Sequence, residues 1–479
     1  EGKDFIQSDF VEKHDFESID AFAGTITDEG LKKLEHHPNV ESVQLDHVFS
    51  LELQDSVPLV NASRLHQAST NITGSGIGVC VLDTGVNYNH VKLSDNYVTG
   101  YDYVNSDSDP LDDHGHGTHV SGIVEGVAPG VKLIHIKVLN GAGSGSESDI
   151  VAGINWCITN KNTYAIKAIT MSLGAGLYSS YCDSSYPVLA SAVNNAVNNS
   201  ILVIASSGND GSTTSISSPG CIQNVTSVGA TDKNDALASY GNRNSLVDLV
   251  APGSSINSTS SSGGYTTLSG TSMSAPHVAG AVVLIQQFSF MNNGTYLTPL
   301  DVESLFKNNA VDVSGYKRIN VYAAVTKLDA TLPSLLMYSP KSQSYPEGNI
   351  TLNYSASDIF LERVYYTING TNITVTNTTV LNVEGGSHTL RLSALDGNNN
   401  MNSTSVTFQV GLPTVTQYSP PHNYNFLNTS LLFNCSLSSA AGIVNLSLYH
   451  NLSGIFSINQ TQLLNGTDGQ YSFSLNASS

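Results

Sequence analysis

The stretch Gly78-Val79-Cys80-Val81-Leu82-Asp83-Thr84-Gly85 is an apolar, β-branched run that ends on an aspartate. Further runs of this kind occur at Leu133–Val138, Ile166–Met171, Ile201–Ala205 and Val225–Val228. Helix-like patterns lie between or after them, at Glu147–Thr159, Val188–Asn199, Ser272–Phe288 and Leu300–Asn309. Continuous apolar strands that alternate with helices are typical of a parallel sheet covered on both faces. Residues from about 72 to 330 are therefore predicted to form an α/β domain around a parallel sheet.

The residues before this region follow a different pattern. Phe22–Ile26 reads as a strand, Asp28–His36 as a short helix, and Val40, Val43 and Leu45 as part of another strand. This pattern predicts a small βαβ-like unit that lacks its first strand.

After Leu332-Pro333 the helical pattern ends, and short alternating strands with Asn-Gly and Asp-Gly turns follow. The tripeptide Tyr338-Ser339-Pro340 recurs 80 residues later as Tyr418-Ser419-Pro420. That period is the size of one small β-sandwich. We therefore expect two all-β modules, the second of them cut short at Ser479.

Composition narrows the class of function. The chain has 479 residues with 19 Lys and Arg against 39 Asp and Glu, and its net charge of −20 argues against a nucleic-acid partner. The sequence contains no run of 18 apolar residues, so it predicts no membrane span. Asn-x-Ser/Thr sequons number 19, of which 13 follow residue 345, and this crowding favours a secreted or cell-surface glycoprotein. Because the chain begins at Glu1 without a signal-peptide pattern, it reads as a fragment or a processed product.

Four short motifs carry the chemistry. The first is the strand that ends on Asp83, and the others are His114-Gly115-His116-Gly117-Thr118-His119, Ser206-Ser207-Gly208-Asn209 and Gly270-Thr271-Ser272-Met273-Ser274-Ala275-Pro276-His277. Ser272 follows a glycine turn and begins a helix, so its hydroxyl is exposed where the helix N-terminus favours negative charge. A serine nucleophile needs a base, and His116 is the candidate. Asp83 can orient that imidazole, and Asn209 can donate to an oxyanion.

In the order Asp, His, Asn and Ser, these motifs resemble those of the subtilisin-like serine proteases, the subtilase family, over roughly residues 20–330. The resemblance implies a catalytic triad of Asp83, His116 and Ser272, with Asn209 in the oxyanion hole. It also implies a substrate-pairing strand at Ser172-Leu173-Gly174 and a primary-pocket wall at Ser206-Ser207-Gly208. By the same resemblance, His119 and His277 are packing residues. The implied activity is a serine endopeptidase that acts on proteins or peptides and uses no organic cofactor.

The resemblance also divides the chain. It implies a ferredoxin-like inhibitory propeptide at residues 1–53, incomplete at its start, and a peptidase domain at 54–331. Immunoglobulin-like β-sandwich modules follow at 333–411 and 414–479, and cell-surface attachment through them is a further expectation. The junction of propeptide and enzyme is expected near Leu53–Gln54. Because the pocket wall and its floor near Ser217 are small and uncharged, we expect an apolar residue before the cut.

The acidic segment from Asp102 to Asp113 places several carboxylates close together, and a bound cation would relieve their repulsion. It resembles a calcium loop of thermitase-type subtilases. That resemblance implies Ca²⁺ ligands at Asp102, Asn105, Asp107, Asp109 and Leu111. The alternative is a solvated acidic loop. Zinc at His114, His116 and His119 is not expected, since no glutamate separates the last two and no cysteine is near.

Five cysteines cannot all pair. Cys80 lies mid-strand and Cys157 on the apolar side of a helix, so both are expected to be buried free thiols. Cys182 and Cys221 lie in irregular segments on either side of a strand end, where a disulfide would close a loop. The sequence indicates no disulfide partner for Cys435.

The leading interpretation is a secreted, autoprocessed peptidase. The alternative is a surface adhesion glycoprotein with a vestigial peptidase domain. The intact set of Asp83, His116, Asn209 and Ser272 argues against that alternative.

Overall fold

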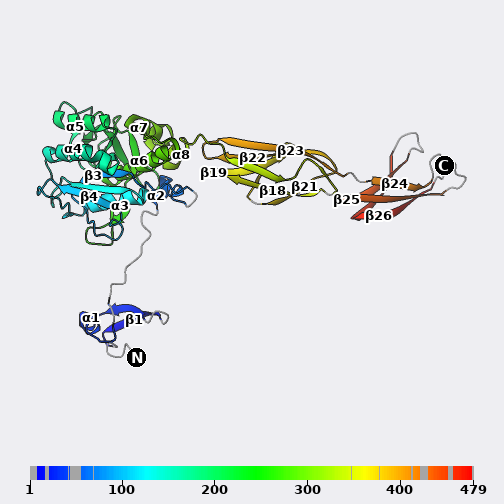
Figure 1. Cartoon of the computed structure of the whole chain (residues 1–479), viewed down its shortest axis with the longest axis horizontal. Coiled ribbons are helices and arrows are strands. Elements are labelled where there is room, and N and C mark those ends of the chain that lie inside the picture. The colour runs from blue at the N-terminus through cyan, green and yellow to red at the C-terminus, as the bar shows by residue number, and fades with distance from the viewer. Residues whose placement is uncertain are drawn as a thin grey trace.

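A computed structural model describes residues 8–16, 21–40, 43, 55–67, 70–346, 348–376, 378–411, 414–420, 430–450 and 457–476. Figure 1 shows a large α/β body, with a small unit at its N-terminal side and an elongated region of strands at its C-terminal side. None of the helices within these residues is both long and apolar enough to cross a membrane.

The α/β body is built on one nine-stranded sheet with the order β14-β15-β11-β10-β8-β6-β3-β5-β4. Its strands are β3 (Gly78–Asp83), β4 (Tyr97–Asp102), β5 (Lys132–Lys137), β6 (Ile166–Met171), β8 (Leu202–Ser206), β10 (Thr226–Thr231), β11 (Leu249–Pro252), β14 (Val311–Val313) and β15 (Tyr316–Arg318). Every neighbouring pair is parallel except β14 and β15 at one edge. The predicted parallel sheet is thus confirmed, and further strands extend it, β4 at one side and the shorter β11, β15 and β14 at the other.

Helices cover both faces of this sheet. They are α2 (Ser56–Leu59), α3 (His116–Val127), α4 (Glu147–Tyr164), α5 (Pro187–Asn198), α6 (Thr271–Asn293), α7 (Pro299–Asn308), α8 (Val321–Thr326) and the 3₁₀ turn η2 (Ala62–Arg64). Val79 and Val81 of β3 belong to a core with α3 and α6, while Cys80 and Leu82 belong to a core with α4 and α5. Alternate residues of a strand face opposite ways, so an apolar run is buried on both sides.

Cys80 and Cys157 are joined in a disulfide, with their Cα atoms 6.3 Å apart. The expectation of two free thiols was therefore wrong. Both side chains are buried in the same core, because α4 packs against the face of the sheet on which Cys80 lies. The sequence alone does not reveal which helical residue lies over which strand residue.

Two small antiparallel hairpin-like sheets complete the body: β7 (Ala175–Tyr178) with β9 (Ile216–Ser218), and β12 (Ile256–Thr259) with β13 (Tyr265–Leu268). The N-terminal unit contains β1 (Phe10–Phe16) paired antiparallel to β2 (Ala21–Ile26), followed by α1 (Asp28–Glu35). Strand β1 was not predicted from the sequence, because charged residues within Phe10–Phe16 conceal its apolar pattern, and the expectation that the unit lacks its first strand stays a prediction. Most of the strand expected around Val40, Val43 and Leu45 lies outside the described residues.

The first C-terminal region contains two sheets. One has the order β16-β18-β21, with β16 (Ser334–Ser339), β18 (Asn349–Ser357) and β21 (Thr379–Asn382). The other has the order β17-β23-β22-β19-β20, with β17 (Ser344–Tyr345), β19 (Leu361–Ile368), β20 (Thr371–Val375), β22 (Gly386–Asp396) and β23 (Met401–Val410). Residues of both sheets form one apolar core, in which Leu352 and Leu390 are fully buried.

The repeated tripeptide marks the same structural feature twice. Strand β16 pairs with β18 and shifts register before Ser339, and β24 (Thr414–Ser419) pairs with β25 (Ser430–His450) and shifts register before Ser419. Strand β26 (Ser457–Asn476) completes this second sheet. The immunoglobulin-like class of the two regions stays a prediction.

Candidate active site

The functional residues gather at the carboxyl ends of three neighbouring strands. In the sheet order, β8, β6 and β3 lie side by side, and Leu82, Met171 and Ala205 are in register across them. Asp83 ends β3, Ser172 follows β6, and Asn209 follows β8. This edge of a parallel sheet is where ligands commonly bind.

Asp83 and His116 form a close pair. The Nδ1 of His116 lies 2.7 Å from Oδ1 of Asp83, which also accepts from the backbone N–H of Thr84 at 2.8 Å. Asp83 is fully buried, whereas about a fifth of the His116 side chain is exposed. With its Nδ1–H donated to the carboxylate, the imidazole has Nε2 free to accept a proton.

The environment of His116 affects its pKa in two opposing ways. Burial disfavours the charged imidazolium, but the Asp83 carboxylate, as a nearby charge and as a hydrogen-bond partner, outweighs burial and raises the pKa above its ordinary value. A general base must be unprotonated, so any reaction that uses His116 as its base should slow as the pH falls through this raised pKa. His119 and His277 are buried and bond to backbone carbonyls instead, consistent with packing.

Ser272 lies in the first turn of α6. Pro276 is four residues further on, and it has no N–H to donate to the Ser272 carbonyl, as a helix would otherwise require. The Ser172 hydroxyl donates to that carbonyl instead, at 2.8 Å. In return the Ser272 hydroxyl donates to the Ser172 carbonyl at 3.4 Å. Among the hydrogen bonds of the described residues, Ser272 thus contacts Ser172 and not His116.

Asn209 is held by its side-chain oxygen. Its Oδ1 accepts from the backbone N–H of Thr271 at 2.8 Å and from the Thr271 hydroxyl at 3.1 Å. That hydroxyl itself accepts from the backbone N–H of Gly208 at 3.1 Å. The amide Nδ2 of Asn209 faces Gly270, where a Cβ atom added to the glycine would lie 3.4 Å away. The amide is thereby oriented to donate beside the start of α6.

A cleft of about 500 Å³ runs past His116. Its lining includes His116 and the three predicted substrate-pairing residues Ser172, Leu173 and Gly174. Of the predicted wall, Ser207 instead turns inward, where its hydroxyl donates to the Asn242 carbonyl at 2.7 Å. Ser206 bonds weakly to the Leu173 carbonyl at 3.4 Å, and neither serine lines the cleft.

Ser217 nevertheless lies close to both glycines of the expected pocket. A Cβ atom added at Gly174 would lie 3.1 Å from the Ser217 side chain, and one at Gly208 only 2.3 Å from its hydroxyl. Gly208 has a φ of +101°, which disfavours any other residue. The atoms nearest to such added Cβ atoms belong to Ser217, Ser218 and Asn242, and the apolar preference of the pocket stays a prediction.

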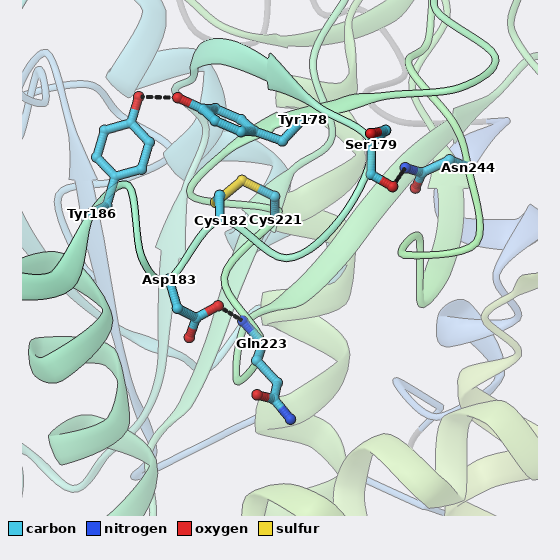
Figure 2. The surroundings of a disulfide bond; sticks show 8 residues. All are labelled: Tyr178, Ser179, Cys182, Asp183, Tyr186, Cys221, Gln223 and Asn244. Carbon is cyan, nitrogen blue, oxygen red and sulfur yellow. Dashed lines mark hydrogen bonds between the residues drawn. A yellow bond between two sulfur atoms is a disulfide. The ribbon is translucent and has the colours of Figure 1, made fainter.

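The sequence analysis missed one wall of the cleft, which Tyr186, Leu189 and Pro219 form. Figure 2 shows the disulfide Cys182–Cys221 near Tyr186, and the hydroxyl of Tyr178 pointing to that of Tyr186. The Cα atoms of the two cysteines are 5.4 Å apart, and the Tyr178 hydroxyl donates to that of Tyr186 at 3.1 Å. The glycine-rich stretch Gly141–Gly145 also reaches the cleft, and its composition was an available signal for a close backbone approach.

In the acidic loop, Asp102 is buried and its carboxylate accepts from the backbone N–H groups of Val104 and Asn105 at 2.7 and 2.9 Å. Asp107 accepts from the N–H of Asp109 at 2.9 Å, and Asp109 accepts from the Tyr88 hydroxyl at 2.9 Å. The donor set is all oxygen and suits Ca²⁺. In the part of the chain that the structure describes, however, the three aspartates do not converge within 4.8 Å. Calcium in this loop stays a prediction.

Residues 74–333 match the family model described as the subtilase family, Peptidase S8. Alkaline serine exoprotease A of Vibrio alginolyticus is 35% identical over 316 residues, which cover 61% of this chain and 55% of that protein. Subtilisin E of Bacillus subtilis is 37% identical over 287 residues, covering 56% and 71%. A solved structure described as a cold-adapted subtilisin-like serine proteinase is 36% identical, with a TM-score of 0.46 and coverage of 52% and 88%. The chain thus spans little more than half the length of the exoprotease.

Proposed function

The chain belongs to the subtilase family, and on this premise we propose that it is a secreted serine endopeptidase acting through Asp83, His116 and Ser272. The observation that carries the proposal is the 2.7 Å contact of His116 with the buried Asp83, beside a cleft lined by Ser172–Gly174. Two disulfides support an oxidising compartment.

The residues have complementary roles in the proposed reaction. The Ser272 hydroxyl turns from Ser172 to attack the scissile carbonyl, and His116 Nε2 takes its proton while Asp83 stabilises the imidazolium. Asn209 Nδ2 and the N-terminus of α6 stabilise the oxyanion. His116 then gives its proton to the leaving amine. Water next adds to the acyl-enzyme and passes a proton to His116. His116 returns this proton to the Ser272 oxygen as the bond between that oxygen and the acyl carbon breaks and the acid product leaves.

Substrate selection follows from the same edge of the sheet. The substrate backbone would pair with Ser172–Gly174, and its residue before the cut would lie near Gly174, Gly208 and Ser217. The side chains nearest to a Cβ atom added at the two glycines, those of Ser217 and Asn242, are uncharged, and this supports a preference for an apolar side chain.

The proposal includes a zymogen and a calcium ion. Residues 1–53 would be the inhibitory propeptide, cleaved near Leu53–Gln54. Asp102, Asn105 and Asp107, with the carbonyls of Asp109 and Leu111, would hold Ca²⁺ and restrain the loop that leads to His116.

Reaction with a fluorophosphonate tests the nucleophile, and Ser272→Ala should lose labelling and lower kcat by roughly a thousandfold or more. Ser262→Ala, at an exposed serine, is the matched control and should label fully. N-terminal sequencing should find the wild type matured to an N-terminus between residues 51 and 57 and Ser272→Ala uncut. Retained activity in Ser272→Ala would refute the triad. Self-processing of Ser272→Ala, or a terminus far outside this window, would refute autoprocessing alone.

A further inference from the structure

Three aspartates meet where the α/β body joins the first C-terminal region. Asp329 follows α8, Asp358 follows β18, and Asp396 ends β22. One carboxylate oxygen of each lies within 4.8 Å of those of the other two. Asp329 and Asp396 are buried, at 2% and 0% exposure, and Asp358 is half-buried. Figure 1 shows this junction between α8 and the start of β19.

The charge of this cluster is not balanced by a neighbouring cation. None of the ion pairs in the described residues involves the three aspartates. The nearby Lys327 ammonium donates to Asn398 Oδ1 at 2.8 Å, and Arg64 lies over the Tyr322 ring, 3.5 Å from its centroid. Burial, together with the neighbouring Asp329 and Asp396 carboxylates, raises the pKa of Asp358. Within the residues that the structure describes, no ion pair therefore compensates the charge of the cluster.

Hydrogen bonds fix the carboxylates but leave one oxygen without a donor. Asp396 Oδ1 accepts from the N–H groups of Asn398 and Asn400 at 2.9 and 2.8 Å, and Oδ2 accepts from the Asn400 amide at 2.8 Å. Asp329 Oδ1 accepts from the N–H and hydroxyl of Thr331 at 2.9 and 2.6 Å. Asp329 Oδ2, in contrast, is buried and has no partner in the described part of the chain. A buried carboxylate oxygen without a donor needs a ligand to satisfy it.

We propose that Asp329, Asp358 and Asp396 bind a divalent cation, Ca²⁺, at the junction of the α/β body and the first C-terminal region. Carboxylates from separate loops are hard oxygen ligands of the kind that Ca²⁺ prefers, and water can complete its six to eight ligands. Zinc is disfavoured because neither His nor Cys belongs to the cluster. The site is separate from the loop 102–111, and it does not depend on peptidase activity.

The cation would join two regions that already contact each other. Phe360 of the first C-terminal region packs against Phe288 and Tyr322, with ring centroids 5.2 and 5.8 Å apart. The side-chain amides of Asn398 and Asn400 donate to the Asp329 carbonyl at 2.6 and 3.0 Å. One ion held by Asp329 on one side and by Asp358 and Asp396 on the other would fix this contact.

Calcium stoichiometry tests the site in the full chain carrying Ser272→Ala, which prevents autolysis. Equilibrium dialysis against CaCl₂ should find one fewer bound Ca²⁺ in Asp329→Asn/Asp358→Asn, which keeps the side-chain shapes and removes two charges. Glu362→Gln, an exposed change of the same kind in β19, is the matched control and should keep the full number. Any calcium bound by the loop 102–111 is common to all three proteins and cancels in the comparison.

Asp358→Asn alone covers the case in which the double variant fails to fold, because Asp358 is only half-buried. It should weaken the binding of one Ca²⁺ at least tenfold, and its melting temperature should respond less to CaCl₂ than that of Glu362→Gln. Equal stoichiometry and affinity in all variants would overturn the proposal. A second result would also overturn the proposal: a melting temperature of Asp358→Asn that is raised equally with CaCl₂ and with chelator. That result would mean that the substitution only relieves the repulsion between the carboxylates.

Discussion

The α/β body and the first C-terminal region bury their interiors in different ways. In the body, a single sheet is covered on both faces, and titratable groups such as His119, His135, His277 and Lys137 are almost fully buried with its apolar cores. In the C-terminal region, two sheets enclose one apolar core, and β18 alternates buried and exposed residues. Buried ionisable groups make the stability of the body dependent on pH. In the C-terminal region, the buried Asp396 and the half-buried Asp358 lie instead at the junction with the body.

Trp156 allows the two regions to be followed separately. It is the only tryptophan of the chain, and it lies in α4 of the body, stacked on Tyr164. Its fluorescence therefore reports the unfolding of the body, whereas circular dichroism reports both regions. Each prediction below uses this difference.

Acid should have the largest effect. Burial lowers the pKa of His119, His135 and His277 to about 4, against about 6.5 in the unfolded chain. Between pH about 4 and about 6.5, the unfolded chain binds more protons than the folded chain does. The stability that these neutral histidines allow is therefore fully present above pH about 6.5 and is lost as the pH falls toward about 4. The loss is at most about 3 kcal/mol per histidine. His116, with its raised pKa, offsets part of it.

Urea unfolding at pH 7.5 and 4.5, with calcium held constant, measures this effect. The transition of Trp156 fluorescence should move to lower urea at pH 4.5, while the part of the dichroism change that Trp156 does not report should move less. Equal shifts of both transitions would contradict the contrast between the regions.

Loss of a disulfide should have the next largest effect on the stability of the body. In the chain-entropy model, loss of Cys80–Cys157, which spans 77 residues, should cost about 4.5 kcal/mol. Loss of Cys182–Cys221, which spans 39 residues, should cost about 4 kcal/mol. Double Cys→Ala variants should lower the urea midpoint of Trp156 fluorescence in this order. Cys435→Ser, in the second C-terminal region, is the control and should leave that midpoint unchanged; a shift there would mean that the regions unfold together.

Asn209→Ala should have the smallest effect of these changes. It should raise the activation free energy of catalysis and leave the free energy of unfolding unchanged. One oxyanion donor contributes roughly 3–4 kcal/mol to the transition state, so kcat should fall by about 10²–10³ with little change in KM. Asn244→Ala, at a surface residue shown in Figure 2, is the matched control and should retain its kcat. Unchanged kcat in Asn209→Ala would show that its amide does not reach the oxyanion. A shifted Trp156 transition would instead indicate a structural role through Thr271.

The sequence predicted the central strands and the positions of Asp83, His116 and Asn209 because each motif is local. Asp83 ends an apolar run and Asn209 closely follows one, so both fall at the carboxyl edge of the sheet, whereas His116 begins α3 in a short motif of Gly and His. Residues brought together from distant segments were not predictable in this way. The pairing of Cys80 with Cys157 depends on how α4 lies over β3, and no local pattern encodes that.

The same reason applies to the cleft wall and the junction. Tyr186 and Leu189 resemble ordinary residues at the start of a helix until β7 and β9 place them beside the cleft. Asp358 and Asp396 resemble turn residues, and only the packing of Phe360 on the body brings them to Asp329. Charged residues in Phe10–Phe16 hid a strand, because the apolar pattern was the only signal used.

The bonds between Ser172 and Ser272 run in both directions, since each side chain donates to the carbonyl of the other residue. Pro276 makes this exchange possible by leaving the Ser272 carbonyl without a helical donor. The main chain after β6 and the start of α6 are therefore linked at a fixed spacing. In the proposed reaction, the attack of the Ser272 hydroxyl would break only one of the two bonds, and the bond from Ser172 would maintain the alignment throughout the turnover.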